Sequence, residues 1–464
     1  MSHVPYGSGV HLALALALHY ELLLGDQSLW SGYLQSLPLE SELSIGLFWA
    51  YRGSVDDIDA EKAREWFLGT EVEQYLLYHP DPGVAILKEI EEYYRDIASP
   101  LLMSLGVLHW TMSGFQHAYS LVSSRAFMVD AYHGLAMVPI ADAFNHTQEN
   151  HVHLETDFHV CVSCGSLSEC VHDAEELDPS RTSKHTTAAS MPGAAVIRPS
   201  SNSEEGENSC EMVVNAPISP YEEVFNTYGE KLTNAELLLR YGFTLDGNEN
   251  DVVSWTVAQV WEACGCAGKG LDEKHIIDVI RTWPMHTGWE DSSLVVNTDI
   301  EGETPPLHIT ADGAITHHLW TLCVLAACSP EWKGKSIGDI VATLERVAEV
   351  QSLVEQMLDE GECMASDSMA YEAVSAEALR KVFATIVVLC RKRMGRIGGG
   401  MGSEAIGEHL DTIPRDHKKT RAAMTHALEC TSMLESCESR WKEMEDIVGS
   451  DIHHPTSALN IRLI

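Results

Sequence analysis

Apolar residues recur at spacings of three and four along the first 120 residues, a pattern that predicts helices. The run HLALALALHYELLLG, residues 11–25, ends in Gly25, and glycine commonly closes a helix. The stretches EKAREWFLGTEVEQYLLYH and VAILKEIEEYYRDIASPLL have the same spacing. Because strand-like alternation does not occur before about Tyr119, we expect residues 1–120 to form a helical module.

The pattern changes near Leu121, where short apolar runs are interrupted by Gly and Pro and so favour strands and turns. These runs are LVSSRAFMVD, GLAMVPIADAFNH and EMVVNAPISPYEEVFNTYG. Between the last two, residues 174–209 contain too few apolar side chains to fix a loop, which predicts a flexible surface insertion. Residues 121–245 are therefore expected to form a core of small strands that carries this insertion.

Helical spacing returns from about Asp251, for example in SIGDIVATLERVAEVQSLVEQMLDEG and TRAAMTHALECTSMLESCESRWKEMEDIV. We expect residues 246–464 to form an all-helical C-terminal domain. The fold class predicted for the whole chain is α+β, with a small-stranded core between two helical regions.

Composition narrows the functional classes. The 30 Lys and Arg against 69 Asp and Glu give a formal net charge of −39. Proteins that bind nucleic acid neutralise phosphates with Lys and Arg, so this balance argues against direct binding of DNA or RNA. Two interpretations stay open: the charge attracts a basic protein partner, or it keeps a large protein soluble.

Sequence features also bear on location. The best apolar run, Val10 to Leu24, is too short to span a membrane, so we expect a buried helix and no membrane partner. It also lacks the basic leader of a secretory signal. The 12 cysteines then favour a reducing compartment with mostly free thiols, and the expected location is the nucleus, the cytoplasm or both.

Three segments carry motifs whose order is more informative than any one of them. They are SSRAF, GLAMVPIADAFNH and EEVFNTYGEKLTNAELLLRYGF. Taken singly, each has an ordinary explanation as a surface charge, a turn or aromatic packing. Together, the sequence Asp-x-x-Asn-His, then Asn-Thr-Tyr-Gly, then Asn-Ala-Glu-Leu-Leu-x-x-Tyr-Gly-Phe resembles the SET-domain lysine methyltransferases. The closest likeness is to the Rubisco large-subunit methyltransferase-like class, which includes fungal ribosomal-protein lysine methyltransferases.

The resemblance implies a site for S-adenosylmethionine. Asn145 and His146 match the Asn-His pair that holds this co-substrate. Arg125 matches an arginine near its carboxylate, and Asp142 an acid that braces the site. In this class the N-terminal helical module is an insertion within the SET fold, and the C-terminal helical domain docks the protein substrate.

The resemblance also implies two catalytic tyrosines. Tyr228, in NTYG, matches the tyrosine at the methyl-transfer pore, and Tyr241, in RYGF, matches one that lines the lysine channel. Methyl transfer to an amine is an in-line displacement, so positioning and electrostatics do most of the work. A lysine amine with a pKa near 10.4 must first lose its proton, and a narrow aromatic channel favours this by desolvation. The implied substrate is a basic lysine-containing protein, with a ribosomal protein as one candidate.

One departure from the class leaves an alternative open. Its members begin the SET fold with strands and a Gly-x-Gly turn, whereas here the insertion-like helix starts within about ten residues of Met1. Gly7-Ser8-Gly9 runs directly into that helix, so we interpret it as a coincidence. The SET core is therefore expected to be N-terminally incomplete. The alternative function is a catalytically inactive SET remnant that acts as a protein-binding module.

A cysteine cluster at the start of the predicted insertion suggests a metal. Cys161, Cys164, Cys170 and His172 have the spacing C-x2-C-x5-C-x-H, which could supply four ligands to one zinc ion. A metal there would offset the entropy of the loop. The alternative is a set of free thiols on a hairpin turn.

Overall fold

The computed structural model describes residues 8–50, 57–79, 82–156, 160–162, 164–166, 170, 210–265, 271, 273–283, 287–290, 292–298, 306–328, 332, 334–359 and 373–453. The chain divides into two compact units. Unit 1 consists of residues 1–43 and 89–231, and unit 2 consists of residues 44–88 and 232–464. The division into parts at residues 120 and 245 stays a prediction.

The helices of unit 1 pack around α1 and α8. Phe115 and Leu121 of α8 are fully buried, as is Leu12 of α1, and the ring of His19 meets Phe115 edge-on at 6.1 Å between centroids. Gly25 ends α1 with a φ of 54°, as the sequence predicted. The helices are α1 (Ser8–Leu24), η1 (Gly25–Gln27), α2 (Ser31–Leu34), α6 (Gly83–Tyr93), which crosses into unit 2, the π-helical η2 (Tyr94–Ala98), α7 (Ser99–Ser104) and α8 (Met112–Arg125).

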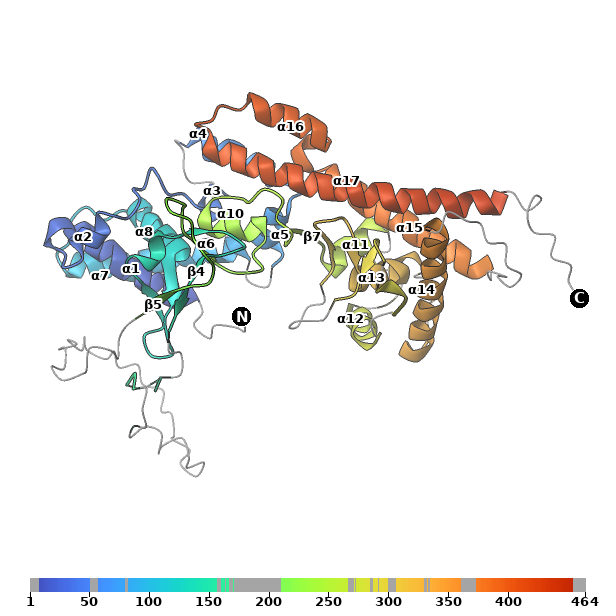
Figure 1. The fold of residues 1–464 in the computed structure, drawn as a ribbon, viewed down its shortest axis with the longest axis horizontal. Helices are drawn as coiled ribbons and strands as arrows, with labels where there is room; N and C mark the ends of the chain where they lie inside the picture. Colours follow the sequence, from blue (N-terminus) through green and yellow to red (C-terminus); the bar gives the residue numbers. More distant parts are fainter. Residues whose placement is uncertain are drawn as a thin grey trace, which may run out of the picture. The chain divides into compact units, whose positions relative to one another are not determined.

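The strands of unit 1 follow α8 and are short. They form three two-stranded pairs: β1 with β2 antiparallel, β3 with β6 parallel, and β4 with β5 antiparallel. Of these strands, β4 and β5 are labelled in Figure 1. The first strand begins at Ala126, because α8 continues to Arg125. Their bounds are β1 (Ala126–Met128), β2 (Leu135–Met137), η3 (Ala141–Ala143), β3 (Asn145–His146), β4 (Val152–Glu155), β5 (Glu211–Val214) and β6 (Phe225–Asn226). The predicted insertion at 174–209 lies outside the described residues.

Unit 2 is mainly helical, as the sequence predicted for the C-terminal region. Trp320 lies at the centre of its core, with ring centroids 5.4 Å from Trp283 and 4.8 Å from Trp289. The helices are α3 (Gly46–Trp49), α4 (Ile58–Trp66), α5 (Glu71–Leu77), α10 (Asn234–Tyr241), α11 (Val257–Ala263), α12 (Glu273–Thr282), η4 (Thr287–Trp289), α13 (His317–Ala327), α14 (Ile337–Asp359), α15 (Ala373–Met394), η6 (Ile397–Gly399), α16 (Ser403–Thr412) and α17 (Lys418–His453).

A small sheet corrects the expectation that residues 246–464 are all-helical. The strands β7 (Val252–Ser254), β9 (His308–Thr310), β10 (Ile315–Thr316) and β8 (Val295–Val296) lie side by side in this order. The pairing of β10 with β8 is parallel and the others are antiparallel. Strands of two or three residues are too short to show alternation, and for this reason the pattern did not predict them.

Buried polar contacts join residues 44–88 to the C-terminal part of unit 2. Arg393, near the end of α15, donates to the main-chain oxygen of Thr70 at 3.0 Å and lies 3.7 Å from the carboxylate of Glu71. The same carboxylate accepts hydrogen bonds from the hydroxyl and the main-chain N–H of Ser254 in β7, at 2.5 and 2.8 Å. Three elements far apart in the sequence, α5, β7 and α15, are thus tied together in the interior of unit 2.

The motif NAELLLRYGF forms α10 and the turn after it. Thr233 caps the helix in a capping box with Glu236, and this satisfies main-chain N–H groups at the N-terminus. Gly242 ends the helix at a φ of 83°, where a Cβ atom would collide with the carbonyl of Ser44. Leu237 is fully buried. Much of this motif therefore has a structural reason.

Asn234, the first residue of α10, links two carboxyl groups inside unit 2. Its side-chain amide donates to Asp251 at 2.9 Å and to Glu429 at 2.8 Å. Burial, reinforced by the charge of Asp251, raises the pKa of Glu429 to about 8, and burial raises the pKa of Asp251 to about 6. The cluster therefore holds a proton near neutral pH.

The variant Glu429→Gln is expected to be less sensitive to alkali than the wild type. The folded carboxyl binds its proton more tightly than an unfolded one with a pKa of 4.5, so wild-type stability falls as pH rises from 4.5 through about 8. Glutamine stays neutral, so the variant should be more stable than the wild type by about 4 to 5 kcal/mol at about pH 9 and by less than about 1 kcal/mol at about pH 5. Urea denaturation at both pH values measures this difference in stability. A difference that does not depend on pH would contradict the raised pKa of Glu429.

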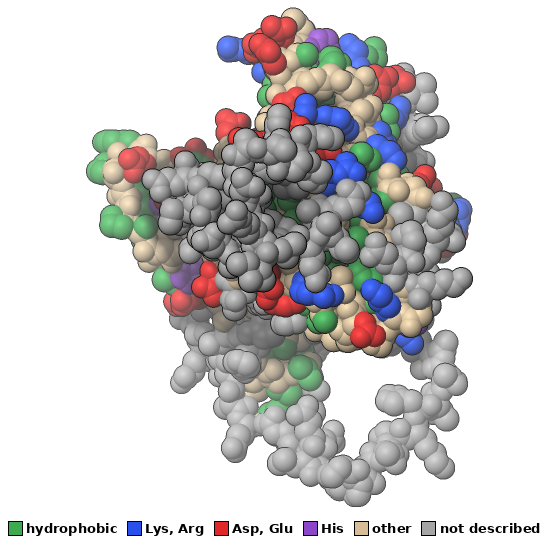
Figure 2. All heavy atoms as spheres, turned by 90° about the vertical axis from the view of Figure 1, so that its right-hand side faces the viewer, with side chains coloured by type: hydrophobic (Ala, Val, Ile, Leu, Met, Phe, Trp, Pro, Cys, Tyr) green, Lys and Arg blue, Asp and Glu red, His purple; other side chains and the backbone are tan. Residues whose placement is uncertain are grey.

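The surface carries both signs of charge. On the face shown in Figure 2, Lys and Arg side chains lie among acidic and apolar ones, so the overall acidic excess does not make that face uniformly negative. Among the described residues, no helix combines the length and apolar character needed to cross a membrane.

Candidate active site

The parallel pairing of β3 with β6 brings two of the sequence motifs together in unit 1. Asn145 lies opposite Phe225, and His146 lies opposite Asn226. The main-chain N–H of Thr147 donates to the oxygen of Asn226 at 3.0 Å, which extends the pairing by one residue. The Asn-His motif and the NTYG motif, about 80 residues apart in the sequence, are therefore neighbours.

His146 and Tyr228 are in direct contact. The main-chain N–H of Tyr228 donates to Nδ1 of His146 at 3.1 Å, and the two rings stack with centroids 5.1 Å apart. His146 is buried, and this burial lowers the pKa of its imidazole. A neutral ring with an unprotonated Nδ1 is what the hydrogen bond from Tyr228 requires, so His146 fixes the position of the tyrosine.

Two further hydrogen bonds hold this strand pair. The hydroxyl of Tyr228 donates to the main-chain oxygen of Phe144 at 3.1 Å, just before β3. The side-chain amide of Asn145 donates to the carboxylate of Glu223 at 2.6 Å, just before β6. The phenol oxygen and the carbonyl oxygen of Phe144 form a pair of hydrogen-bond acceptors beside the stacked rings. The sequence alone did not indicate that the carbonyl would be that of Phe144.

Arg125, Asp142 and Tyr33 form a second group in unit 1. Arg125, the last residue of α8, donates to the main-chain oxygen of Asp142 at 2.6 Å. The carboxylate of Asp142 is buried and accepts a hydrogen bond from the hydroxyl of Tyr33 at 2.6 Å. Burial, together with this hydrogen bond and the charge of Asp142, raises the pKa of Tyr33 well above its usual value. The sequence did not indicate Tyr33, which lies 109 residues before its partner.

Arg125 retains a hydrogen-bonding donor. Its Nε–H is buried and has no hydrogen-bond partner among the residues that the structure describes. A guanidinium with an unused buried donor suits a carboxylate ligand, because charged hydrogen bonds between these groups are among the strongest in proteins. This arrangement fits the role that the resemblance implied for Arg125.

Tyr241 is the one predicted catalytic or cofactor-binding residue that lies in unit 2. It is the last residue of α10, and its ring lies 6.2 Å from that of Phe243. Burial raises the pKa of its hydroxyl. Its predicted role in lining a lysine channel stays a prediction.

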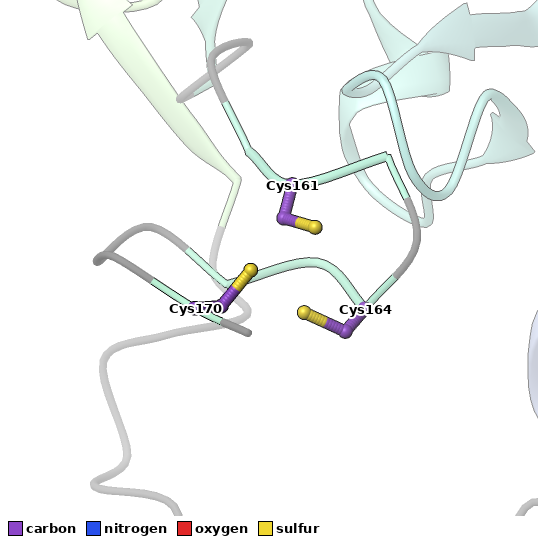
Figure 3. A group of neighbouring side chains, drawn as sticks. All are labelled: Cys161, Cys164 and Cys170. Carbon is purple, nitrogen blue, oxygen red and sulfur yellow. The ribbon is translucent and has the colours of Figure 1, made fainter. Parts of the chain in front are cut away.

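The predicted metal ligands Cys161, Cys164 and Cys170 come together. One sulfur atom from each lies within 4.8 Å of the others, and Figure 3 shows the three side chains turned toward a common centre. Cys164 is exposed, and the other two are partly buried. His172, the predicted fourth ligand, lies outside the described residues.

Solved structures reveal the fold. No family model matches the chain. The crystal structure of the SET domain of LSMT bound to methyllysine and AdoHcy matches 95% of this chain and 76% of its own, with a TM-score of 0.52 and 14% identity. The structure of Rubisco LSMT bound to sinefungin and monomethyllysine matches with a TM-score of 0.53 at the same identity and coverage.

The chain therefore has the SET-domain fold of the Rubisco LSMT type, which confirms the predicted likeness and the predicted mixture of helix and strand. At the level of sequence, it is similar to the ribosomal lysine N-methyltransferase 3 of Saccharomyces cerevisiae. The two are 33% identical over 163 residues, which is 29% of this chain and 29% of the yeast protein. The match thus spans less than a third of the length of this relative.

Proposed function

We propose that this protein is a protein-lysine N-methyltransferase that uses S-adenosylmethionine. The observation that carries the proposal is the pairing of β3 with β6, which places Asn145, His146 and Tyr228 together within a SET-type fold. The fold alone permits many functions, so the proposal rests on this local group, which contains three residues from the sequence motifs. The name of the yeast relative supports the same activity.

The residues of unit 1 fit the co-substrate. Arg125 would receive its carboxylate through the unused Nε–H, and the loop held by the Tyr33–Asp142 hydrogen bond would keep Arg125 in place. Asn145 and His146 would line the same S-adenosylmethionine site. When bound, S-adenosylmethionine supplies an electrophilic methyl group on a positively charged sulfur.

The oxygens near Tyr228 would orient the lysine. A neutral amine can donate its N–H groups to the phenol oxygen and to the carbonyl of Phe144, which lie within hydrogen-bonding distance of each other. Held in this way, the lone pair of the amine points away from both oxygens and toward the methyl donor. Burial of the lysine side chain on binding would disfavour its charged ammonium form and so help the lysine to lose its proton.

The proposed substrate is a basic protein of the ribosome. The name of the yeast relative supports a ribosomal substrate, and the net charge of −39 agrees with long-range attraction of a basic partner. The net charge is compatible with a basic substrate but does not identify one, because acidic surfaces also keep proteins soluble. With a ribosomal substrate, the protein would act in the nucleus or the cytoplasm.

The proposal is tested by methyl transfer from tritiated S-adenosylmethionine to a ribosomal extract. We expect label in a small number of basic proteins, released as methyllysine on hydrolysis. The variant Arg125→Met should weaken binding of S-adenosylmethionine about 10-fold or more in calorimetry, because a charged hydrogen bond is lost.

The outcomes separate the enzyme from the inactive remnant. Binding together with transfer supports the enzyme. Binding without transfer to any ribosomal or other basic protein would favour a protein-binding module, and the absence of both would overturn the proposal. The N-terminally extended gene product, if one is encoded, should be assayed beside the 464-residue chain.

A further inference from the structure

We propose that Cys161, Cys164 and Cys170 bind one zinc ion that stabilises unit 1. The proposal is independent of methyl transfer, and it rests on three observations. The sulfur atoms are grouped, the backbone forms a tight turn of the kind that presents two thiolates to one ion, and this turn packs against the turn between β1 and β2.

The grouping of the sulfur atoms fits a tetrahedral ion. With a Zn–S distance of about 2.3 Å, ligand atoms in a tetrahedron lie about 3.8 Å apart. All three sulfur atoms lie within 4.8 Å of one another, and Figure 3 shows the three side chains turned toward one another. Thiolates are soft ligands that select zinc over magnesium or calcium. Three of the four positions of a structural zinc site are thus accounted for.

Main-chain hydrogen bonds link Cys161, Cys164, Gly165 and Ser166 in a tight turn. The N–H groups of Cys164 and Gly165 both point to the main-chain oxygen of Cys161, at 3.3 and 2.7 Å, and the N–H of Cys161 donates to Ser166 at 2.9 Å. Gly165 has a φ of 74°, which suits glycine and lets the turn close directly after the second cysteine. Two thiols of a Cys-x-x-Cys pair are thereby placed on the same side.

The turn is anchored against the part of unit 1 that follows Arg125. A Cβ atom on Gly165 would lie 2.8 Å from the ring of Tyr132, so the two residues are in close contact. Tyr132 belongs to the turn between β1 and β2, where Asp130 accepts hydrogen bonds from the N–H groups of Tyr132 and His133 at 2.8 and 2.6 Å. A metal that fixes the cysteine turn would therefore also support the β1–β2 turn.

Binding replaces protons by the metal. Each thiol loses its proton to solvent as a Zn–S bond forms, and three thiolates leave the ion with one further position for another ligand or water. No oxidation or reduction is involved. Because protons compete with zinc for the thiolates, the site should release its metal as the pH falls.

The test measures zinc in the full chain, purified without a metal-affinity column. We expect one zinc ion per chain, lost with chelator and restored by zinc alone, with a thermal midpoint that rises with zinc concentration. The variant Cys164→Ser is suitable because this side chain is exposed and contributes little packing. Its zinc affinity should fall at least about 100-fold. Cobalt substitution should give thiolate charge-transfer absorption that Cys164→Ser reduces.

Cys210 offers a matched control. It is a partly buried cysteine directly before β5, in the same region but outside the group of three. Cys210→Ser should keep the full zinc content, and an equal loss in both variants would show that the ligand set is wrong. A wild-type chain that holds no zinc after reconstitution would overturn the proposal, as would a disulfide among the three cysteines in protein kept under reducing conditions.

Discussion

The variant Tyr228→Phe is expected to lose methyl-transfer turnover by about 100-fold or more while it stays folded. The substitution removes one oxygen atom and keeps the ring that stacks on His146 at 5.1 Å. It also keeps the main-chain N–H that donates to His146. What it removes is the phenol oxygen near the carbonyl of Phe144, one of the two acceptors proposed to orient the amine.

The size of this effect follows from the chemistry. Loss of one positioned polar group at a reacting centre typically costs 10²–10³-fold in turnover, about 3 to 4 kcal/mol. Binding of S-adenosylmethionine should change little, because Arg125 and Asp142 are intact. The measurement is single-turnover methyl transfer, with calorimetry of the co-substrate and thermal unfolding on the same preparation.

Tyr221→Phe is the matched control. This tyrosine precedes β6 on the same segment, its side chain is fully exposed, and no role in the site is assigned to it. Its turnover should stay within about twofold of the wild type, as expected for an exposed surface position. If Tyr228→Phe also retained full turnover, Tyr228 would serve packing only, and the proposed mechanism would lose its central residue.

The sequence motifs contain three residues that the structure brings together, Asn145, His146 and Tyr228. Their roles in binding and catalysis stay predictions. Short motifs were enough because each contributes a few adjacent residues whose geometry is set by one strand pair, β3 with β6. By contrast, no motif predicted the hydrogen bond between Asn145 and Glu223. The same holds for Tyr33, whose partner Asp142 is 109 residues away, so that nothing in the local pattern around SLWSGYLQSLP points to it.

The helices were predictable for a similar reason. Spacing and end signals are local, so α1 with its closing glycine was predicted from the sequence alone. The helix α10 was not predicted, although Thr233 and Glu236 have the spacing of a capping box. The four strands of unit 2 could not be predicted, because each has only two or three residues and depends on partners far along the chain. The pattern of apolar and polar residues likewise did not predict which polar groups are buried in unit 2. Removing one of these buried groups is expected to have the largest effect on stability.

Arg393→Met is expected to destabilise unit 2 by about 3 to 5 kcal/mol, the usual cost of breaking one buried ion pair by removing a partner. Burial lowers the pKa of Arg393 and raises that of Glu71, and the charge of each residue opposes the shift of the other. Without the guanidinium, the carboxylate would keep only its two hydrogen bonds from Ser254, and the main-chain oxygen of Thr70 would lose its donor. Urea denaturation of the full chain, followed by tryptophan fluorescence, measures the loss. Trp255, whose ring lies 5.8 Å from the guanidinium carbon, serves as a local probe.

Arg391→Met is the control on the same helix. Arg391 is 54% exposed and pairs with Glu438 at 2.6 Å, so its loss should cost no more than about 1 kcal/mol. The double variant Arg393→Met with Glu71→Gln should recover part of the stability, because no unpaired charge then stays buried. Equal, small effects at positions 391 and 393 would mean that the buried pair contributes nothing beyond packing. A large loss at Arg393 alone, relieved by the change at Glu71, would show that this buried pair is one of the contacts that stabilise the packing of residues 44–88 on the C-terminal part of unit 2.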